Sequence, residues 1–237
     1  MIGNKGTAKE RAARAGAELV ESGMVVGLGS GSTSALMVGF LGQRVRELGL
    51  AIMAVATSEA TAQMAREAGI PLLELDEVSG LDISLDGADE IDGQFAMIKG
   101  LGGALLREKI VAAASRRRVT LITAEKRVTQ LGLVCPLPIE VSRFGLVHTE
   151  RGLKRLGAET KIRRKGSELI LTDGGNCIID CEFAGIPDPA GLDPRVQGLP
   201  GVLETGLFVG LCDTLIIGSA DRVEHIEVDR QGRRASD

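Results

Sequence analysis

The sequence predicts an α/β protein built on a doubly wound, mostly parallel sheet, and two observations support this fold class. Short apolar runs typical of buried strands alternate with longer segments of helical composition from the N-terminal region to Lys126. Polar or glycine-rich loops follow several of these runs, at the carboxyl ends of the predicted strands, where sheets of this kind bind ligands. The 237 residues are enough for one large domain or two modest ones.

The first predicted elements are a helix, a strand and a second helix. Thr7 and Glu10 fit a capping box, and the alanine-rich segment that follows predicts a helix as far as Gly23. The apolar run Met24–Leu28 is typical of a short buried strand. A helical pattern then begins after residue 33 and ends at Gly49.

Between that strand and the second helix, the loop Gly29-Ser30-Gly31-Ser32-Thr33 has the composition of a phosphate-binding loop. Backbone N–H groups at the start of a helix bind anions, and hydroxyl side chains add donors. The loop lacks the third glycine of a dinucleotide fingerprint and the Gly-Lys-Ser/Thr of a nucleotide-binding P-loop. It therefore favours a small phosphate ester, although a tight strand-to-helix turn has the same composition.

Further strands are predicted at Leu50–Ala56, Leu72–Leu75, Leu81–Leu85 and Val119–Thr123, with a helix between the first two that ends at Gly69. Each main strand is followed by polar residues. These are Thr57 and Ser58, then Asp86 to Asp89, and finally Lys126. Because the carboxyl ends of parallel strands meet at one edge of a sheet, we expect these side chains to contribute to one site.

The segment from Asp86 to Glu108 carries most of the candidate chemistry. It contains a carboxylate cluster, one lysine and a glycine-rich turn that precedes a helix predicted from Ala104 to Arg118. The residues concerned are Asp86, Asp89, Glu90, Asp92, Lys99, Gly100, Gly102, Gly103 and Glu108. Carboxylates at a strand end and glycines at a helix start are suited to binding anions and transferring protons. A solvated acidic loop followed by a tight turn is the alternative interpretation.

The pattern changes near Pro136, after which short predicted strands and glycine turns extend to about Gly206. The predicted fold is a doubly wound, mostly parallel (Rossmann-like) sheet with a smaller α+β (ferredoxin-like) second domain. The boundaries predicted are 1–135 plus 207–237 for the main α/β catalytic domain and 136–206 for the second domain. The run beginning at Leu207 and the segment Asp213–Ala220 are predicted to return to the main sheet, and Arg116–Arg118 to end a helix.

Composition excludes several function classes. The net charge of −4 and the 2% aromatic content argue against nucleic acid as a partner. Two histidines leave little material for a histidine-built zinc site or a Ser-His-Asp triad. The four cysteines are scattered, which is typical of buried thiols in a reducing compartment. No apolar run approaches the roughly 20 residues of a membrane span, so we expect a cytoplasmic protein with no membrane partner.

Seven motifs occur in order along the chain: GLGSGST, TSEATAQMAREAGIPL, DGADEID, KGLGGALLREKI, PLPIEV, TDGGN and PGVLETGLF. Together they resemble type A ribose-5-phosphate isomerase over nearly the whole length. The resemblance implies interconversion of ribose 5-phosphate and ribulose 5-phosphate in the pentose phosphate pathway, with no metal and no cofactor. It also implies an α/β main domain, a small α+β domain and a homo-oligomer, either a homodimer or a homotetramer.

The resemblance also implies roles for individual residues. The catalytic residues would be Glu108 as general base, with Asp86, Asp89 and Lys99. The substrate-binding residues would be Ser30, Gly31, Ser32, Thr33, Asp86, Gly87, Ala88, Asp89, Lys99, Gly100, Leu101, Gly102 and Lys126. The sequence departs from the family pattern at Ser30, where threonine is commoner, and at Leu101, which replaces a glycine. It also departs around Lys126, where it has TAEKR, and at Gly174, which replaces an asparagine.

The chemistry of the residues agrees with this resemblance. Aldose–ketose isomerisation passes through an enediolate and needs an ionised base together with donors for the developing oxyanion. Glu108 is suited to be that base and Lys99 to stabilise the oxyanion. Two other classes remain open: a non-catalytic sugar-phosphate sensor of similar fold, and a metal-dependent phosphate-transfer enzyme that uses Asp86, Asp89 and Asp92.

Overall fold

The computed structural model describes residues 6–229, which form two compact units. The first unit comprises residues 6–87, 110–126 and 211–229, and the second comprises residues 88–109 and 127–210. These units do not have the bounds of the two predicted domains, because residues 88–109 group with the second unit. The predicted domain boundaries stay a prediction.

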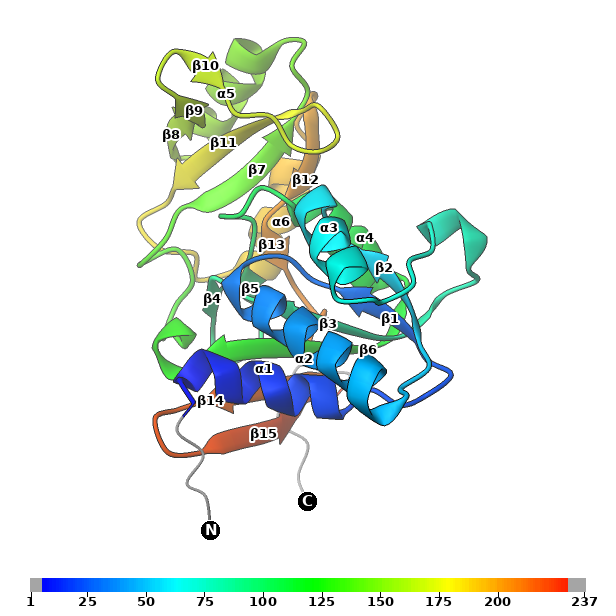
Figure 1. Ribbon diagram of the computed structural model, residues 1–237. Helices are drawn as coiled ribbons and strands as arrows, with labels where there is room; N and C mark the ends of the chain where they lie inside the picture. Colours follow the sequence, from blue (N-terminus) through cyan, green and yellow to red (C-terminus); the bar gives the residue numbers. More distant parts are fainter. Residues whose placement is uncertain (1–5, 230–237) are drawn as a thin grey trace. The chain divides into compact units, whose positions relative to one another are not determined.

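The first unit contains a six-stranded sheet in the order β15-β14-β6-β3-β1-β2 (Figure 1). Its strands are β1 (Val25–Leu28), β2 (Met53–Ala56), β3 (Leu81–Gly87), β6 (Ser115–Thr123), β14 (Thr214–Gly218) and β15 (Val223–Glu227). The pairs from β14 to β2 are all parallel, and only β15 runs antiparallel to its neighbour. The predicted mostly parallel sheet is confirmed.

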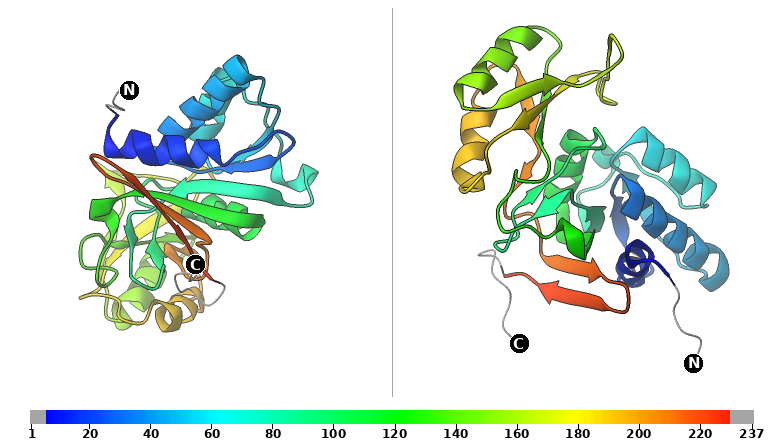
Figure 2. Two further views of the ribbon diagram at one scale, coloured as in Figure 1. Left: turned by 90° about the horizontal axis from the view of Figure 1, so that it is seen from below. Right: turned by 90° about the vertical axis from the view of Figure 1, so that its left-hand side faces the viewer.

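Helices cover both faces of this sheet, as a doubly wound fold requires. α1 (Ala8–Glu18) and α2 (Ser32–Leu48) lie side by side on one face, and α3 (Glu59–Glu67) packs beside α2 (Figures 1 and 2). The C-terminal half of α4 (Leu105–Ala113) packs on the other face. There a Cβ added to Gly27 would lie only 2.6 Å from Val111 Cγ1, so glycine in β1 lets this helix approach.

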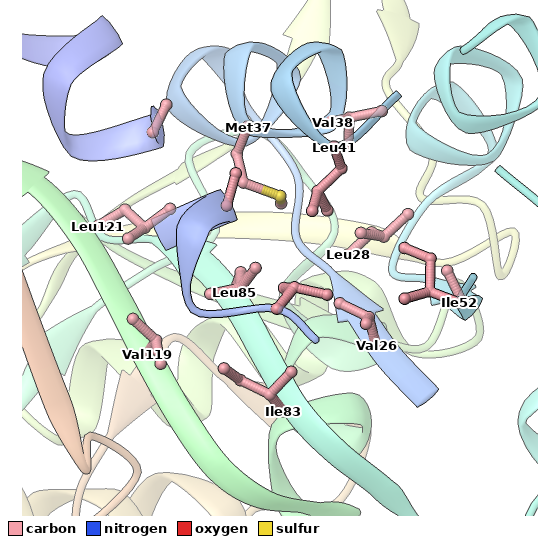
Figure 3. Close-up of a cluster of buried hydrophobic side chains, with 14 of the residues drawn as sticks. Val26, Leu28, Met37, Val38, Leu41, Ile52, Ile83, Leu85, Val119 and Leu121 are labelled. Carbon is pink, nitrogen blue, oxygen red and sulfur yellow. The ribbon is translucent and has the colours of Figure 1, made fainter. Parts of the chain in front are cut away.

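The main core of the first unit lies between α1, α2 and the sheet (Figure 3). Alternate residues of each strand point toward α2, whose apolar face supplies the opposing side chains. The residues include Val26, Leu28, Ile83, Leu85, Val119 and Leu121 of the strands and Met37, Val38 and Leu41 of α2. Complete burial of one such side chain contributes about 1.5–3 kcal/mol, so this layer is a main source of stability in the first unit.

Local capping explains where the first helices begin and end. The side chain of Thr7 accepts a hydrogen bond from the Glu10 backbone and the Glu10 side chain accepts one from Thr7, which confirms the capping box. α2 ends at Gly49, whose left-handed φ of 65° suits glycine, as predicted. α1 ends at Glu18 rather than continuing to Gly23, because residues after Leu19 turn toward β1.

The second unit contains a four-stranded antiparallel sheet with two helices on one face (Figure 2). Its elements follow the order β7 (Leu137–Val141), α5 (Leu146–Arg155), β8 (Glu159–Ile162), β11 (Cys177–Glu182), α6 (Pro189–Gln197) and β12 (Val202–Thr205). The βαββαβ order and the strand arrangement β12-β7-β11-β8 are those of a ferredoxin-like fold, which confirms the predicted α+β part.

Two smaller sheets complete the second unit. One pairs β9 (Arg164–Lys165) with β10 (Glu168–Leu169), and the other has the order β13-β5-β4. The strands of the latter are β4 (Glu90–Ile91), β5 (Met97–Ile98) and β13 (Leu207–Phe208). The segment at Leu207 therefore pairs with β5 in the second unit, and the prediction that it returns to the main sheet is wrong.

Two other local predictions are wrong because tertiary pairing overrides local composition. The helix α4 already ends at Ala113. The residues Arg116–Arg118 belong to β6, because the segment from Ser115 to Leu121 pairs with β3 along nearly the full length of β3. The predicted strand Leu72–Leu75 is reduced to a bridge between Leu72 and Ala54, followed by a 3-10 helix at Leu75–Glu77. A second 3-10 helix, Ala124–Lys126, follows β6.

The structure also bears on membrane association, over the part of the chain that it describes. Across residues 6–229, the helices all lack the length or the apolar character that a bilayer-crossing segment needs.

An ion pair joins β6 to the start of β14. Arg118 donates to Asp213 through its backbone N–H at 2.8 Å, Nε at 2.6 Å and Nη2 at 2.7 Å. Burial, the largest single influence, acts to raise the pKa of Asp213, but the hydrogen bonds and charge of Arg118 together lower it. A carboxyl group whose pKa is lowered on folding stabilises the fold above its unfolded pKa of about 3.9, and this contribution is lost as the pH falls further.

We therefore expect Asp213→Asn to lower the free energy of unfolding at pH 7 and to do so progressively less as the pH falls below about 4. Chemical denaturation of both proteins across this pH range measures the difference. Asp221→Asn, at an exposed aspartate, is the control and should behave as wild type throughout. A difference for Asp213→Asn that grows as the pH falls would contradict this account of the pair.

Candidate active site

The loop that joins β1 to α2 has the geometry of an anion-binding loop. Gly31 precedes the first turn of α2 with φ 93°, a conformation that favours glycine, and Ser32 and Thr33 are the first residues of the helix. The N–H groups of a first helical turn have no partner within the helix, and the helix dipole makes this end attractive to anions. The loop thus begins a helix as predicted, and phosphate binding stays a prediction.

Asp86 holds this loop in place from the end of β3. Its Oδ1 accepts hydrogen bonds from Ser30 N at 3.1 Å, Ser34 Oγ at 3.1 Å and Gly87 N at 2.7 Å. Gly29 passes so close that an added Cβ would lie 2.1 Å from the same oxygen. Asp86 and Gly29 thus determine the path of the loop.

A cluster of hydroxyl groups anchors the other side of the loop. Ser30 Oγ lies 2.8 Å from Thr57 Oγ1 and donates to Ser58 Oγ at 2.8 Å, while Thr61 Oγ1 donates to Gly29 O at 3.0 Å. The prediction that Thr57 and Ser58 lie at the same sheet edge as Ser30 is confirmed. Ser30 therefore helps to shape the loop through its side chain.

Lys9 adds positive charge at this loop, and a second lysine, Lys126, follows the carboxyl end of β6 in the same unit. Lys9 Nζ donates to Ser32 Oγ at 3.0 Å, and Lys126 ends the 3-10 helix after β6. Both lysines act on the carboxyl group of Glu125. Its pKa is lowered chiefly by hydrogen bonds from the Thr123 hydroxyl and from its own backbone, and further by the charges of Lys126 and Lys9. Sequence reasoning missed Lys9, because a single lysine in an alanine-rich helix carries no motif.

In the second unit, the turn after β5 carries Lys99. Its backbone N–H donates to Gly206 O at 2.9 Å, which holds the start of the turn against the residue before β13. Gly100 and Gly103 have positive φ angles of 106° and 86°, and Gly103 N donates to Gly100 O at 3.0 Å. Leu101 does not have a positive φ and is 41% exposed. The turn therefore accepts a leucine side chain at this position, where the family pattern has glycine.

Asp89 connects the segment 86–89 to the turn of residues 99–103, here called the lysine turn. Its backbone N–H donates to Ile98 O at 2.9 Å, and its Oδ2 accepts a hydrogen bond from Leu101 N at 3.0 Å. The carboxylate is thereby placed next to the residues that follow Lys99. Asp89 and the turn form one hydrogen-bonded group.

Lys99 and Glu108 form an ion pair that is almost completely buried. Lys99 Nζ lies 3.3 Å from Glu108 Oε2, and the two residues are only 5% and 6% exposed. Glu108 is in the first turn of α4, where its N–H donates to Ala104 O at 2.9 Å. The ring of Phe208 lies 5.4 Å from Lys99 Nζ, within cation–π range. An ammonium at this distance favours the ionised carboxylate, which burial alone would disfavour.

The remaining carboxylates of the segment have structural partners. Buried Glu90 accepts backbone hydrogen bonds from Gly132, Val134 and Cys135, and Asp92 Oδ1 accepts them from Gln94 and Ala96. Within residues 6–229, no three His, Cys, Asp or Glu side chains are grouped so that they could hold a metal ion.

The predicted site residues thus form two groups, one in each unit. The first unit holds Ser30 to Thr33, Asp86, Gly87 and Lys126, and the second holds Ala88, Asp89, Lys99 to Gly102 and Glu108. The peptide bond between Gly87 and Ala88 is the covalent link between the two groups. Each group is assembled from segments distant in sequence.

Comparison with known proteins places the sequence among sugar-phosphate isomerases. Residues 53–222 match the family model described as ribose 5-phosphate isomerase A (phosphoriboisomerase A). The chain is 52% identical to ribose-5-phosphate isomerase A of Gloeobacter violaceus over 91% of this chain and 94% of the relative. It is 47% identical to the protein of that name from Cereibacter sphaeroides, over 91% of this chain and 88% of the relative.

Solved structures agree with the sequence comparison. Ribose 5-phosphate isomerase A from Methanocaldococcus jannaschii superposes with a TM-score of 0.89 at 36% identity, covering 93% of this chain and 98% of that one. A D-ribose-5-phosphate isomerase in complex with phospho-erythronic acid also gives a TM-score of 0.89, at 33% identity, covering 93% and 97%.

The close approach of Gly29 to Asp86 generates a stability prediction. Gly29→Ala places a methyl group against the Asp86 carboxylate, and overpacking of this kind costs about 1–3 kcal/mol. Gly39→Ala is the matched control, because a Cβ there meets no atom within 4 Å and alanine favours helix α2. Thermal unfolding should show a lower Tm for Gly29→Ala alone. Equal melting temperatures in the two variants would disprove the steric role of Gly29.

Proposed function

The chain belongs to the ribose 5-phosphate isomerase A family, and from this premise we propose that Glu108 is the base that transfers the proton during isomerisation. The protein is an enzyme that interconverts ribose 5-phosphate and ribulose 5-phosphate. The single observation that carries the assignment of the base is the buried pair between Lys99 and Glu108. A relative solved with phospho-erythronic acid supports a phosphorylated sugar as the ligand.

We assign the phosphate group of the substrate to the loop of the first unit. The start of α2 supplies backbone N–H groups, Ser32 and Thr33 supply hydroxyls, and Lys9 supplies a charge 3.0 Å from Ser32 Oγ. A doubly charged phosphate is attracted by both the helix dipole and the lysine. Lys126 is a further candidate ligand from the same unit.

The proton transfer follows from the chemistry of an aldose phosphate. The Glu108 carboxylate removes the proton from C2, and the electron pair of that C–H bond forms the C1–C2 double bond of an enediolate while the carbonyl oxygen takes the negative charge. Return of the proton from Glu108 to C1, with a proton shift between the two oxygens, yields the ketose. The ionised form of Glu108 is required at the first step, and Lys99 favours it.

Lys99 has a second role in the proposal, which is to stabilise the enediolate oxygen. Its ammonium group lies next to the base, and the Phe208 ring and the hydrogen bond from its backbone N–H to Gly206 O restrict its position. A preorganised cation in a site with little water stabilises developing charge more strongly than it would in solution. Asp86 and Asp89 are proposed to bind sugar hydroxyls and to assist ring opening.

The assembly and location remain predictions. We propose a homodimer or homotetramer in the cytoplasm, on the family resemblance, and light scattering of the purified protein measures the molar mass of the assembly.

The reaction class is tested by proton NMR of ribose 5-phosphate in deuterated buffer with the purified enzyme. Formation of ribulose 5-phosphate with deuterium at C1 is expected, because a proton held on a carboxyl group exchanges with solvent. An excess of chelator should leave the rate unchanged, since Lys99 is the proposed electrophile. Binding without turnover would identify a sensor, and loss of activity on chelation with rescue by Mg²⁺ would favour a metal-dependent mechanism.

The phosphate assignment predicts a change in substrate affinity. Lys9→Met and Thr33→Ala should each raise KM by about 10- to 100-fold with little change in kcat, because hydrogen bonds to charged groups contribute about 1.5–3 kcal/mol. Free ribose should be a very poor substrate. Lys161→Met, at an exposed lysine of the second unit, is the charge-matched control. Efficient turnover of unphosphorylated ribose would rule out this role for the loop.

The role of Glu108 predicts a change in kcat. Glu108→Gln keeps the shape of the side chain and removes the basic oxygen, so kcat should fall by at least about 10²- to 10⁴-fold while KM changes much less. Glutamine has a similar helix propensity, so α4 should persist. Steady-state kinetics and the Tm of the variant measure both effects. A folded variant with near-normal kcat would show that another residue is the base, and Asp86 would be the next candidate.

A further inference from the structure

Arg163 contacts the lysine turn although it is distant from it in sequence. It follows β8, its backbone N–H donates to Ile178 O at 2.9 Å, and its side chain is only 14% exposed. Through Nη1 it donates to two carbonyl oxygens of the turn, Gly100 O at 3.2 Å and Leu101 O at 3.1 Å. One guanidinium group therefore contacts two successive peptide groups next to Lys99.

Asp180 of β11 holds the guanidinium group in the orientation that makes these contacts. Arg163 Nε donates to Asp180 Oδ2 at 2.9 Å and Nη2 donates to Oδ1 at 2.5 Å, a bidentate arrangement. Asp180 is 17% exposed, so the pair is partly shielded from water. A planar, bidentate pair fixes the direction of the remaining donor, Nη1, in a way that a lysine could not.

The contacts with the carbonyl oxygens determine where the N–H groups of the turn point. In a trans peptide, C=O and N–H point in opposite directions, and the described residues contain no cis peptide bond. The peptide between Gly100 and Leu101 is bound on both sides, by Arg163 at its carbonyl and by Asp89 at its N–H. In the next peptide, Arg163 binds Leu101 O, so the Gly102 N–H points away from the guanidinium group.

From this geometry we propose that Arg163, held by Asp180, is a positioning residue for the isomerase reaction. It orients the peptide groups of residues 100–102 so that the turn presents Lys99 and the Gly102 N–H to the enediolate oxygen. Its positive charge also polarises the two carbonyl groups, which strengthens the N–H groups of the same peptides as donors. This inference rests on the proposed function of Lys99 and Glu108.

A purely structural role for Arg163 makes a different prediction. An ion pair that only joins strands of the second unit would change the stability of the fold and leave turnover at 25 °C unchanged. A positioning role changes the transition state, because misplacement of a catalytic group by about 1 Å can cost on the order of 10² in rate. The ratio of the effects on kcat and on KM separates the two roles.

The test compares Arg163→Met with Arg164→Met in the full-length enzyme. Arg164 is the adjacent arginine, and its side chain donates to Ser167 O at 2.9 Å within its own hairpin. We expect Arg163→Met to lower kcat by about 10- to 100-fold, with KM for ribose 5-phosphate changed less than about threefold. Arg163→Lys should recover little of this loss, since lysine cannot reproduce the bidentate pair. Arg164→Met should have wild-type kinetics.

A second measurement reports on the turn without substrate. Amide hydrogen exchange of Leu101 and Gly103 should become faster in Arg163→Met and Asp180→Asn, while exchange in the six-stranded sheet stays unchanged. If Arg163→Met fails to fold, Arg163→Lys and Asp180→Asn are judged by the same kinetic criterion. Wild-type kcat in a folded Arg163 or Asp180 variant would overturn the inference. An inactive wild-type enzyme would instead reject the proposed function itself.

Discussion

The buried ion pair between Lys99 and Glu108 is the interaction around which the candidate site of the second unit is arranged. Removing two charges from water is costly, and geometry must compensate for that cost. The first turn of α4 places Glu108, the glycine turn after β5 places Lys99, and Phe208 lies against the ammonium group. The small sheet of β4, β5 and β13 thus helps to bring one carboxylate and one ammonium group together.

Local chemistry explains why much of the fold could be predicted. Thr7 and Glu10 cap α1, Gly49 ends α2, and alternating strands and helices produce the parallel sheet. Predictions were wrong where pairing partners distant in sequence decide the structure. Arg116 extends β6 because β3 offers a full-length partner, and Leu207 pairs with β5 rather than with the main sheet. β15 (Val223–Glu227) was not predicted, because its sequence V-E-H-I-E does not alternate apolar and polar residues.

In the candidate site too, features set by local sequence could be predicted and features set by distant contacts could not. The sequence motifs predict Glu108, Lys99 and the loop before α2 as site residues, because their residue types and spacing carry chemistry that can be read locally. Lys9 and the pair of Arg163 with Asp180 could not be found in this way. Their proposed roles rest only on contacts with segments far along the chain, and neither lies in a recognisable pattern. Asp86 has a further role that only the structure reveals, as the acceptor that shapes the loop at Gly29.

We propose that Lys99 keeps Glu108 ionised in surroundings that would otherwise favour the neutral acid. Carbon-13 NMR of the glutamate side-chain carboxyls, with Glu108 assigned by comparison with Glu108→Gln, observes this directly. We expect a carboxylate signal for Glu108 at pH 7 in the wild-type enzyme and a protonated carboxyl in Lys99→Met at the same pH. A protonated Glu108 in the wild-type enzyme, or an ionised Glu108 in folded Lys99→Met, would contradict it.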